Sequence, residues 1–229
     1  MMILERPEFF DSRDKLHFAF RATPLRKIIV FLLGTLFKLI MKLEVQGTEN
    51  LPTDGAVVLT ANHVTNFDVI PMQLSIPRPI FFMGKASLFK IPVFASIIRD
   101  LGAFPVHRGE KDEWAIRHAA RILEHGQTLG MFPEGRRSKG GGLGVAKTGS
   151  ARLALDANCP IVPMAVIGSD KFFEHFPRRT HVTVKILPLI LPKPGETPLA
   201  LMDRVMFTLA AELPEEMRGV YSEMPKGFD

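Results

Sequence analysis

The sequence predicts an α/β domain in which a mostly parallel central sheet is flanked by helices. From about Val45 onward, short apolar runs of strand length alternate with amphipathic segments of helix length. Strands that alternate with helices are typical of a largely parallel sheet covered on both faces. The chain of 229 residues is long enough for a sizeable core, and its 46% of hydrophobic residues excludes a disordered protein. We expect residues 44–229 to form this domain and residues 1–43 to form a separate helical segment.

Residues 23–43 predict an apolar helix with a basic stripe. Most of its surface is Ile, Val, Leu, Phe and Met, and the stripe consists of Lys27, Lys38 and Lys42. The longest run without a charge, 28–37, is half of the roughly 20 residues that a membrane span needs. We therefore expect an interfacial helix that lies in the membrane plane with its lysines toward anionic head groups. A helix packed only on protein and a true span are the alternatives, and a second, shorter amphipathic helix is expected within residues 8–20.

Six apolar runs in the body of the chain predict strands, at 56–61, 79–84, 102–107, 128–133, 160–168 and 181–190. Two amphipathic stretches predict helices, at 110–126, where Gly126 is a stop signal, and at 147–157. In parallel sheets, ligands bind beyond the carboxyl ends of the strands. Polar residues that directly follow the runs are therefore the first candidates for a functional site.

Charge and cysteine content narrow the partners and the compartment. The net charge of +5 favours anionic partners, which include nucleic acid, phosphorylated substrates and anionic lipid. The single cysteine, Cys159, excludes an intrachain disulfide and a cysteine-rich metal site, and we interpret it as a buried structural thiol. The first residues carry acids where a signal peptide would be basic and then apolar. We therefore expect the protein to stay in a reducing cytoplasm.

Four polar residues each lie just after a predicted strand: His63, Lys85, Arg108 and Glu134. Because the carboxyl ends of parallel strands lie at one edge of a sheet, we expect these four side chains to converge there. His63 and Asp68 form a pair of special interest. On one regular helix they would point about 140° apart, but a strand that ends near His63 and a helix that begins near Asp68 would fold them together.

A histidine held by a carboxylate is suited to act as a base, because the carboxylate fixes the tautomer and stabilises the imidazolium. The alternatives are a structural histidine, an aspartate that only caps a helix, and a pair of metal ligands. The metal motifs H-E-x-x-H and C-x-x-C are both missing, and we expect no metal. No G-x-S-x-G elbow exists, and the surroundings of Ser150 and Ser169 do not fit a nucleophile. A base without a protein nucleophile should activate a hydroxyl of the substrate itself.

The stretch "FPEGRRS", residues 132–138, places a carboxylate, a turn glycine and two guanidinium groups after a strand. The guanidinium fork matches phosphate oxygens, although Glu134 could instead pair only with a neighbouring arginine. The stretch "GGLGVAKT", residues 141–148, nearly matches a phosphate loop, but Ala146 stands where glycine is needed and no buried strand directly precedes it. We interpret it as a mobile glycine segment before a helix, with Lys147 as a candidate to face the site.

Four blocks in this order resemble the glycerolipid acyltransferases, and most closely the 1-acylglycerol-3-phosphate acyltransferases. "NHVTNFD" at 62–68 is similar to the family's H-x4-D block, "GAFPVHR" at 102–108 to its second block, "FPEGRRS" to its third and "IVPMAVIG" at 161–168 to its fourth. The resemblance runs from about 45 to 191. One departure is Arg136, which stands where the family usually has Thr and leaves the acceptor head group open.

The resemblance implies that His63 is the general base for the free hydroxyl of a lysophosphatidate and that Asp68 orients it. The acyl donor is a thioester, either acyl-CoA or acyl carrier protein, which acts as a co-substrate, and no cofactor is expected. The oxyanion donor would be a backbone N–H near the motif or Lys85. The residues implied to hold the glycerol phosphate are Arg108, Glu134, Gly135 and Lys85, and the accessory candidates are Asn62, Arg136, Arg137, Ser138 and Lys147.

Two other functions remain open from the sequence: an acyltransferase for a different lysolipid or glycerol-phosphate acceptor, and a membrane-binding protein without catalysis. A nucleic-acid partner is not expected, because basic charge alone favours one and no recognisable binding module is present. With its predicted interfacial helix, the protein is expected at the cytoplasmic face of the cell membrane, as a peripheral or monotopic protein.

Overall fold

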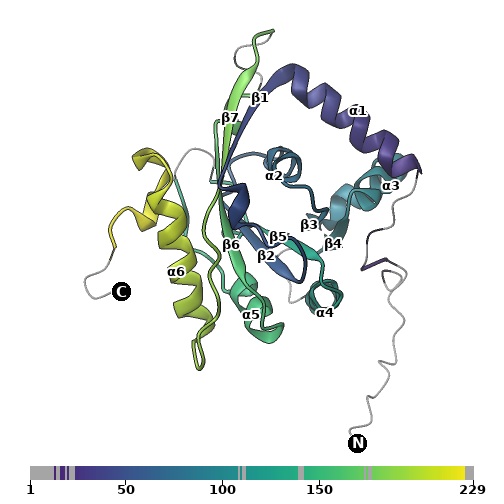
Figure 1. Cartoon of the computed structure of the whole chain (residues 1–229). Coiled ribbons are helices and arrows are strands. Elements are labelled where there is room, and N and C mark those ends of the chain that lie inside the picture. Colours follow the sequence, from purple (N-terminus) through teal and green to yellow (C-terminus); the bar gives the residue numbers. More distant parts are fainter. Residues whose placement is uncertain are drawn as a thin grey trace, which may run out of the picture.

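The computed structural model describes residues 13, 16–18, 20, 24–107, 109, 112–138, 142–172, 174 and 177–224. Within them, seven strands form one sheet in the order β1-β7-β6-β2-β5-β3-β4 (Figure 1). The strands are β1 Met41–Gln46, β2 Val57–Ala61, β3 Ile80–Lys85, β4 Ala103–Val106, β5 Thr128–Met131, β6 Ile161–Ile167 and β7 Thr180–Ile186. All neighbouring pairs are parallel except β6 and β7, which are antiparallel. The predicted α/β class with a mostly parallel sheet is therefore confirmed.

Helices cover both faces of the sheet (Figure 1). They are α1 Pro24–Ile40, α2 Val69–Ser75, α3 Pro92–Asp100, α4 Glu113–Glu124, α5 Gly149–Asp156 and α6 Pro198–Ala211. The core is divided in the same way, because successive strand residues point to opposite faces. Val58 packs in the cluster that contains α4, α5 and α6, whereas Val57 and Leu59 pack in the cluster that contains Phe37 of α1 and Met72 of α2.

The first strand was not expected from the sequence, which predicted helix as far as residue 43. In the structure α1 ends at Ile40, and Met41 begins β1 opposite Thr180 of β7. Met41 is buried in the core, so its side chain and the backbone pairing with β7 together favour strand over one further helical turn. The second helix expected within residues 8–20 falls largely outside the described residues.

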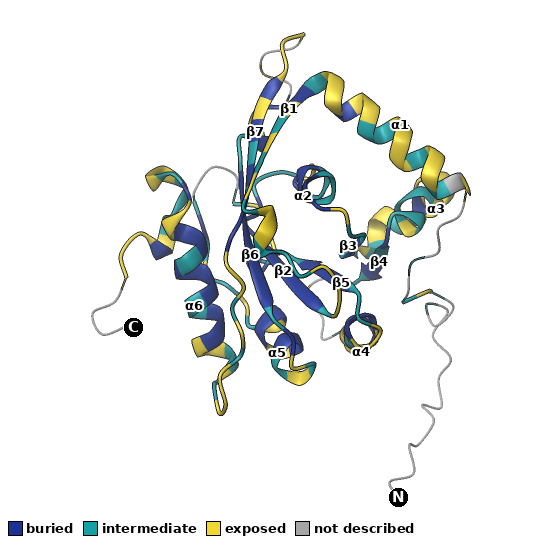
Figure 2. Ribbon diagram, viewed as in Figure 1, coloured by how far each residue is buried: buried dark blue, intermediate teal, exposed yellow. Residues whose placement is uncertain are grey.

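The amino-terminal helix α1 has 17 residues. In the described part of the chain, no helix combines the length and the apolar character that a membrane crossing requires. Much of α1 is nevertheless exposed to solvent in spite of its apolar sequence (Figure 2). The interpretation of Cys159 as a buried thiol agrees with its 3% exposure, and burial raises its pKa to about 11.

Candidate active site

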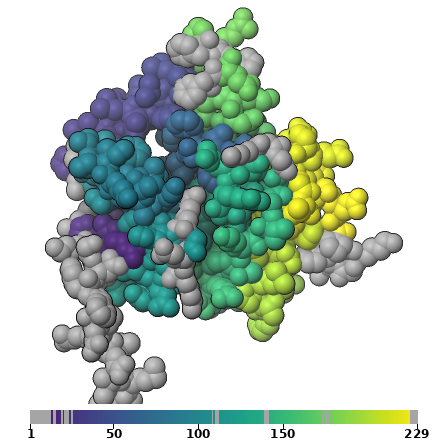
Figure 3. All heavy atoms as spheres, turned by 180° about the vertical axis from the view of Figure 1, so that it is seen from behind, coloured from purple at the N-terminus to yellow at the C-terminus, as the bar shows by residue number. Residues whose placement is uncertain are grey.

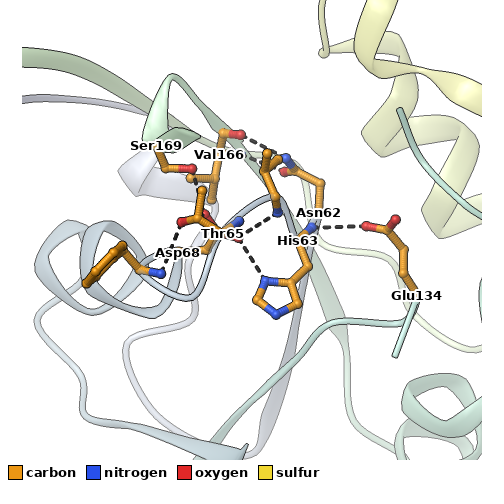
Figure 4. A network of polar contacts seen from close by, with 9 residues as sticks. Asn62, His63, Thr65, Asp68, Glu134, Val166 and Ser169 are labelled. Carbon is orange, nitrogen blue, oxygen red and sulfur yellow. Dashed lines mark hydrogen bonds and ion pairs between the residues drawn. The ribbon is translucent and has the colours of Figure 1, made fainter. Parts of the chain in front are cut away.

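The site begins where β2 leaves the sheet. The strand ends at Ala61, the chain turns through residues 62–68, and α2 begins at Val69. This corner brings the Nδ1 atom of His63 to within 2.8 Å of the Oδ2 atom of Asp68 (Figure 4). His63 is 7% exposed and Asp68 is fully buried. A contact between these two groups is thus shielded from water on most sides.

Further donors surround the Asp68 carboxylate. Its Oδ2 atom accepts the backbone N–H groups of Val64 at 2.7 Å and Thr65 at 2.9 Å. Its Oδ1 atom accepts the hydroxyls of Thr65 at 3.1 Å and Ser169 at 2.6 Å. Asp68 occupies the N-cap position of α2, but its side chain makes no capping hydrogen bond to that helix. The carboxylate is therefore committed to the His63 corner, where these donors hold it in one orientation.

Ser169, whose surroundings in the sequence do not fit a nucleophile, also contributes to the site. It follows Gly168 at the end of β6 and begins the short 3-10 helix η4, Ser169–Lys171. It lies 101 residues from Asp68 in the chain, and it reaches the carboxylate because β6 pairs with β2. No sequence spacing could have indicated this contact, since it depends on the order of strands in the sheet.

The imidazole of His63 stacks on the ring of Phe132, with ring centroids 4.0 Å apart and an angle of 16° between the planes. The ring of Phe82 is in turn nearly parallel to that of Phe132, with centroids 6.3 Å apart and an angle of 13° between the planes. With Nδ1 facing Asp68 and one ring face against Phe132, the imidazole has a defined position. If Nδ1 carries the hydrogen, it donates a hydrogen bond to Asp68. In this tautomer Nε2 is the nitrogen that can accept a proton.

Glu134 joins two loops behind His63. Its Oε1 atom accepts the backbone N–H of His63 at 3.0 Å, and its Oε2 atom accepts the N–H of Gly144 at 3.1 Å (Figure 4 shows the His63 contact). Burial raises the pKa of Glu134, and the two N–H donors and the nearby His63 act against this rise. Because both oxygens bind backbone donors and a carboxylate repels phosphate, the geometry favours a positioning role over direct contact with a phosphate. Among the described residues, no arginine forms an ion pair with Glu134.

Asn62 and Ser138 also hold the backbone on either side of His63. The amide of Asn62 donates to the carbonyl of Val166 and accepts its N–H, both at 2.8 Å, so it extends the β2–β6 pairing beyond Ala61. The N–H of Ser138 donates to the carbonyl of His63 at 2.8 Å. Asn62 through its side chain and Ser138 through its backbone thus fix the path of the loop that carries the imidazole.

The glycine segment was predicted to be mobile, but residues 142–148 are anchored by the carboxyl-terminal part of the chain. The N–H of Leu143 donates to the carbonyl of Met217 at 2.9 Å, and the carbonyl of Leu143 accepts the N–H of Val220 at 3.0 Å. The hydroxyl of Tyr221 accepts the N–H of Ala146 at 3.1 Å. The sequence could not indicate these contacts, because the partners lie about 75 residues further along the chain. Residues 139–141 lie outside the described part.

Lys147 extends from this segment over the turn at Gly135 in residues 132–138. Its N–H donates to the carbonyl of Pro133 at 2.8 Å, and its side chain crosses Gly135. Gly135 has a φ of +66°, and a Cβ atom there would lie 3.2 Å from the Nζ atom of Lys147. The left-handed backbone therefore favours glycine at this position, and a larger residue would also displace the flexible end of Lys147 slightly.

Exposed cations lie along the same edge of the sheet, and we call them the cationic rim: Lys85, Arg136, Arg137 and Lys147. Lys85 ends β3, which lies two strands from β2 in the sheet and hence on the order of 10 Å from it. Arg136 and Arg137 follow β5, the strand between them. The remaining predicted cation, Arg108, lies outside the described residues.

A cavity of about 270 Å³ adjoins the network, and its lining includes Asn62, Val64, Glu134, Gly168, Lys171 and Met217. It therefore lies beyond the ends of β2, β5 and β6, where a parallel sheet binds its ligands. Among the described residues, no three or more His, Cys, Asp and Glu side chains are grouped so that they could hold a metal ion. The arrangement offers a fixed base beside exposed cations, which suits proton removal from an anionic substrate.

A family model described as "Acyltransferase" matches residues 42–167. The chain is 30% identical over 135 residues to the 1-acyl-sn-glycerol-3-phosphate acyltransferase of Borreliella burgdorferi, and these residues are 58% of this chain and 54% of the relative. It is 32% identical over 130 residues to the protein of the same name from Escherichia coli, with 55% of this chain and 53% of the relative covered. The match thus spans about half the length of each of these curated relatives.

A solved structure is also similar to this chain. It is the crystal structure of the 1-acyl-sn-glycerophosphate acyltransferase PlsC from Thermotoga maritima, with a TM-score of 0.67 and 28% sequence identity. The similarity covers 81% of this chain and 76% of that one. The likeness therefore extends well beyond the residues that the family model matches.

Proposed function

The chain belongs to the acyltransferase family, and we propose that it transfers a fatty acyl group from a thioester donor to the free hydroxyl of 1-acyl-sn-glycerol 3-phosphate, giving phosphatidate. The observation that carries this proposal is the buried contact between His63 and Asp68, which lies at the carboxyl edge of the sheet within the matched region. The names of the relatives in Borreliella burgdorferi and Escherichia coli support the choice of acceptor.

In the proposed mechanism, the Nε2 atom of His63 accepts the proton of the acceptor hydroxyl while Asp68 holds Nδ1. The oxygen that loses this proton attacks the thioester carbonyl, the C–S bond breaks, and the departing thiolate takes the proton from His63. A positioned base of this kind contributes about 10²–10⁴-fold to the rate. A donor to the developing oxyanion adds about 10²–10³-fold, and a backbone N–H near the corner or Lys85 fills this role.

The phosphate of the acceptor would bind to cations at the same edge. We propose Arg108 as its principal partner, with Lys85, Arg136, Arg137 and Lys147 around it. Guanidinium groups can bind phosphate oxygens through two hydrogen bonds at once, and exposed side chains can adjust to a bound head group. Gly135 and Glu134 would shape the turn that presents these cations, with Asn62 and Ser138 holding the loop of His63.

The donor is proposed to be acyl-CoA or acyl carrier protein, both of which are acidic and suit a chain with a net charge of +5. The acceptor is a membrane lipid, and α1 would meet the membrane in its plane. Supporting this, Phe31, Leu32 and Leu39 of α1 are 60–70% exposed. We therefore expect a peripheral or monotopic protein at the cytoplasmic face of the membrane.

Arg136 supports a second candidate acceptor. This exposed guanidinium stands where the glycerolipid acyltransferases usually have threonine, so the cationic rim carries one additional positive charge. A lysolipid with a more strongly anionic head group would use that charge. Replacing Arg136 by Thr should then favour lysophosphatidate over such a lipid.

The test is thiol release from each donor, measured with and without lysophosphatidate, in wild type and in His63→Ala. Loss of the base should lower kcat by about 10²–10⁴-fold. The matched control is His181→Ala, since the His181 side chain is exposed on β7 and its imidazole pairs with Glu44. Activity of His63→Ala close to wild type would refute the mechanism, and lysophosphatidate-independent release would refute the acceptor.

A further inference from the structure

We propose that a second surface, at the end of β3 and the start of α3, contacts the bilayer together with α1. This α3 patch consists of Leu88 in the 3-10 helix η3, Ala86–Lys90, and of Ile91, Val93 and Phe94. These side chains are 44%, 60%, 74% and 42% exposed. Single exposed apolar side chains are ordinary on a soluble protein, but four large ones within seven residues mark an interaction surface.

The local sequence explains why the patch points outward. Pro92 starts α3, and the helix has only one fully buried residue, Ala95, which faces the body of the protein. The five residues from Lys90 to Phe94 are all exposed. The first turn of α3 therefore leaves its large apolar side chains largely uncovered by protein, and Figure 2 shows this exposed stretch at the start of α3.

The charges around the patch favour an anionic lipid surface. Residues 80–99 include Lys85, Lys90 and Arg99 and contain no Asp or Glu. The guanidinium of Arg99 lies 5.4 Å from the ring centroid of Phe89. Apolar side chains bordered by lysine and arginine are the pattern by which interfacial segments bind anionic lipid, with the apolar groups below the head groups and the cations among them.

The α3 patch and α1 have the same kind of composition and lie next to each other. Residues 24–40 also carry basic residues without Asp or Glu, and their exposed apolar side chains are Ile28, Val30, Phe31, Leu32, Leu36 and Leu39. The two segments are neighbours, since Arg26 in the first turn of α1 interacts electrostatically with Asp100 at the end of α3. Figure 3 shows purple α1 beside the blue-teal region of the chain that contains η3 and α3.

This arrangement would present the proposed active site to the membrane. The α3 patch starts three residues after Lys85, which belongs to the cationic rim, and Phe67 beside Asp68 is 38% exposed. A lysolipid could therefore keep its acyl chain in the bilayer while its head group reaches the rim. Only this delivery of the lysolipid to the cationic rim rests on the proposed function; binding of the α3 patch to the bilayer does not. A fluid bilayer also needs no complementary shape, which suits two exposed segments better than one rigid protein partner does.

The experiment measures binding of the full chain to phosphatidylcholine vesicles with and without phosphatidylglycerol, by flotation. The variant Ile91→Ser/Phe94→Ser should bind the anionic vesicles about tenfold more weakly, because two large side chains no longer enter the lipid. The matched control is Leu199→Ser on α6, which is 59% exposed on the opposite face of the sheet (Figure 1). Its affinity should equal that of wild type. Equal affinity of the double variant and wild type would overturn the proposal.

A second measurement separates this inference from the proposed function. With a short-chain lysophosphatidate in solution, the double variant should turn over like wild type, and with the acceptor in vesicles its rate should fall with its binding. If vesicle binding is unchanged but the variant loses rate only with acyl carrier protein as donor, the patch serves that protein and the lipid proposal is wrong. It is also wrong if sedimentation shows a wild-type dimer that the double variant loses while vesicle binding stays the same. If no form of the protein is active, the flotation result still decides whether the α3 patch binds the bilayer.

Discussion

Two groups of side chains lie along the carboxyl edge of the sheet, and they differ in burial and in hydrogen bonding. At the corner after β2, the Asp68 carboxylate is fully buried and accepts hydrogen bonds from backbone, hydroxyl and imidazole groups. The cationic rim is exposed, and within the described part of the chain no hydrogen bond or ion pair holds its four side chains. This difference fits the proposed mechanism, in which a base must be held in one orientation, whereas cations that bind a lipid head group can be ordered by the ligand.

The largest effect is expected from breaking the buried corner itself. In Asp68→Asn, an amide nitrogen would face either the N–H donors of Val64 and Thr65 or the hydroxyls of Thr65 and Ser169. The imidazole would lose its orientation, and kcat should fall by about 10²–10⁴-fold. Steady-state kinetics with Asp156→Asn as the exposed control would measure this, and a fall in stability without any fall in kcat would count against the role of Asp68.

Removal of a cation should have a different kinetic signature. Replacement of Arg108 by Ala should raise the KM for lysophosphatidate by about 10- to 100-fold and change kcat much less, because hydrogen bonds between charged groups contribute about 1.5–3 kcal/mol. Arg152→Ala, an exposed arginine on α5, is the matched control. An unchanged KM would remove Arg108 from the phosphate site.

Ser169 offers a sharper test of how the corner is held. In Ser169→Ala the Oδ1 atom of Asp68 loses its shortest hydrogen bond, and we expect kcat to fall by about tenfold while the KM for the acceptor stays the same. Ser169→Thr keeps the hydroxyl and should restore most of kcat. If Ala and Thr at this position give equal rates, the hydroxyl has no part in positioning Asp68.

The smallest effect concerns stability and pH. The raised pKa of Glu134 means that the folded protein binds more protons than the unfolded one between the ordinary value and the raised value. The stability of wild type relative to Glu134→Gln, which has no titrating group there, should therefore decrease as the pH rises through that range. Urea unfolding at several pH values measures the difference, and an increase with pH would contradict the burial of a costly charge.

Several features of the fold and the site could be predicted from residues near one another in the chain. Alternating apolar runs indicated β2 to β7, and His63 and Asp68, five residues apart, indicated a corner between a strand and a helix. These predictions concern local patterns of side chains, which depend on the 2.0- and 3.6-residue periods of strands and helices. The strand β1 was not predicted, because its formation depends on pairing with β7, about 140 residues further along the chain.

By itself, the sequence determined the α/β class, the strand ends at which polar residues gather, and the ordered blocks that resemble the acyltransferases. Only the tertiary structure decided which distant groups support the site: Ser169 on Asp68, Phe132 against His63, and Glu134 between two backbone N–H groups. It also decided which apolar side chains of α1 and α3 stay uncovered. The physical reason is that hydrogen bonding and burial depend on which surfaces meet when the strands are ordered in the sheet, and local spacing carries no information on that order.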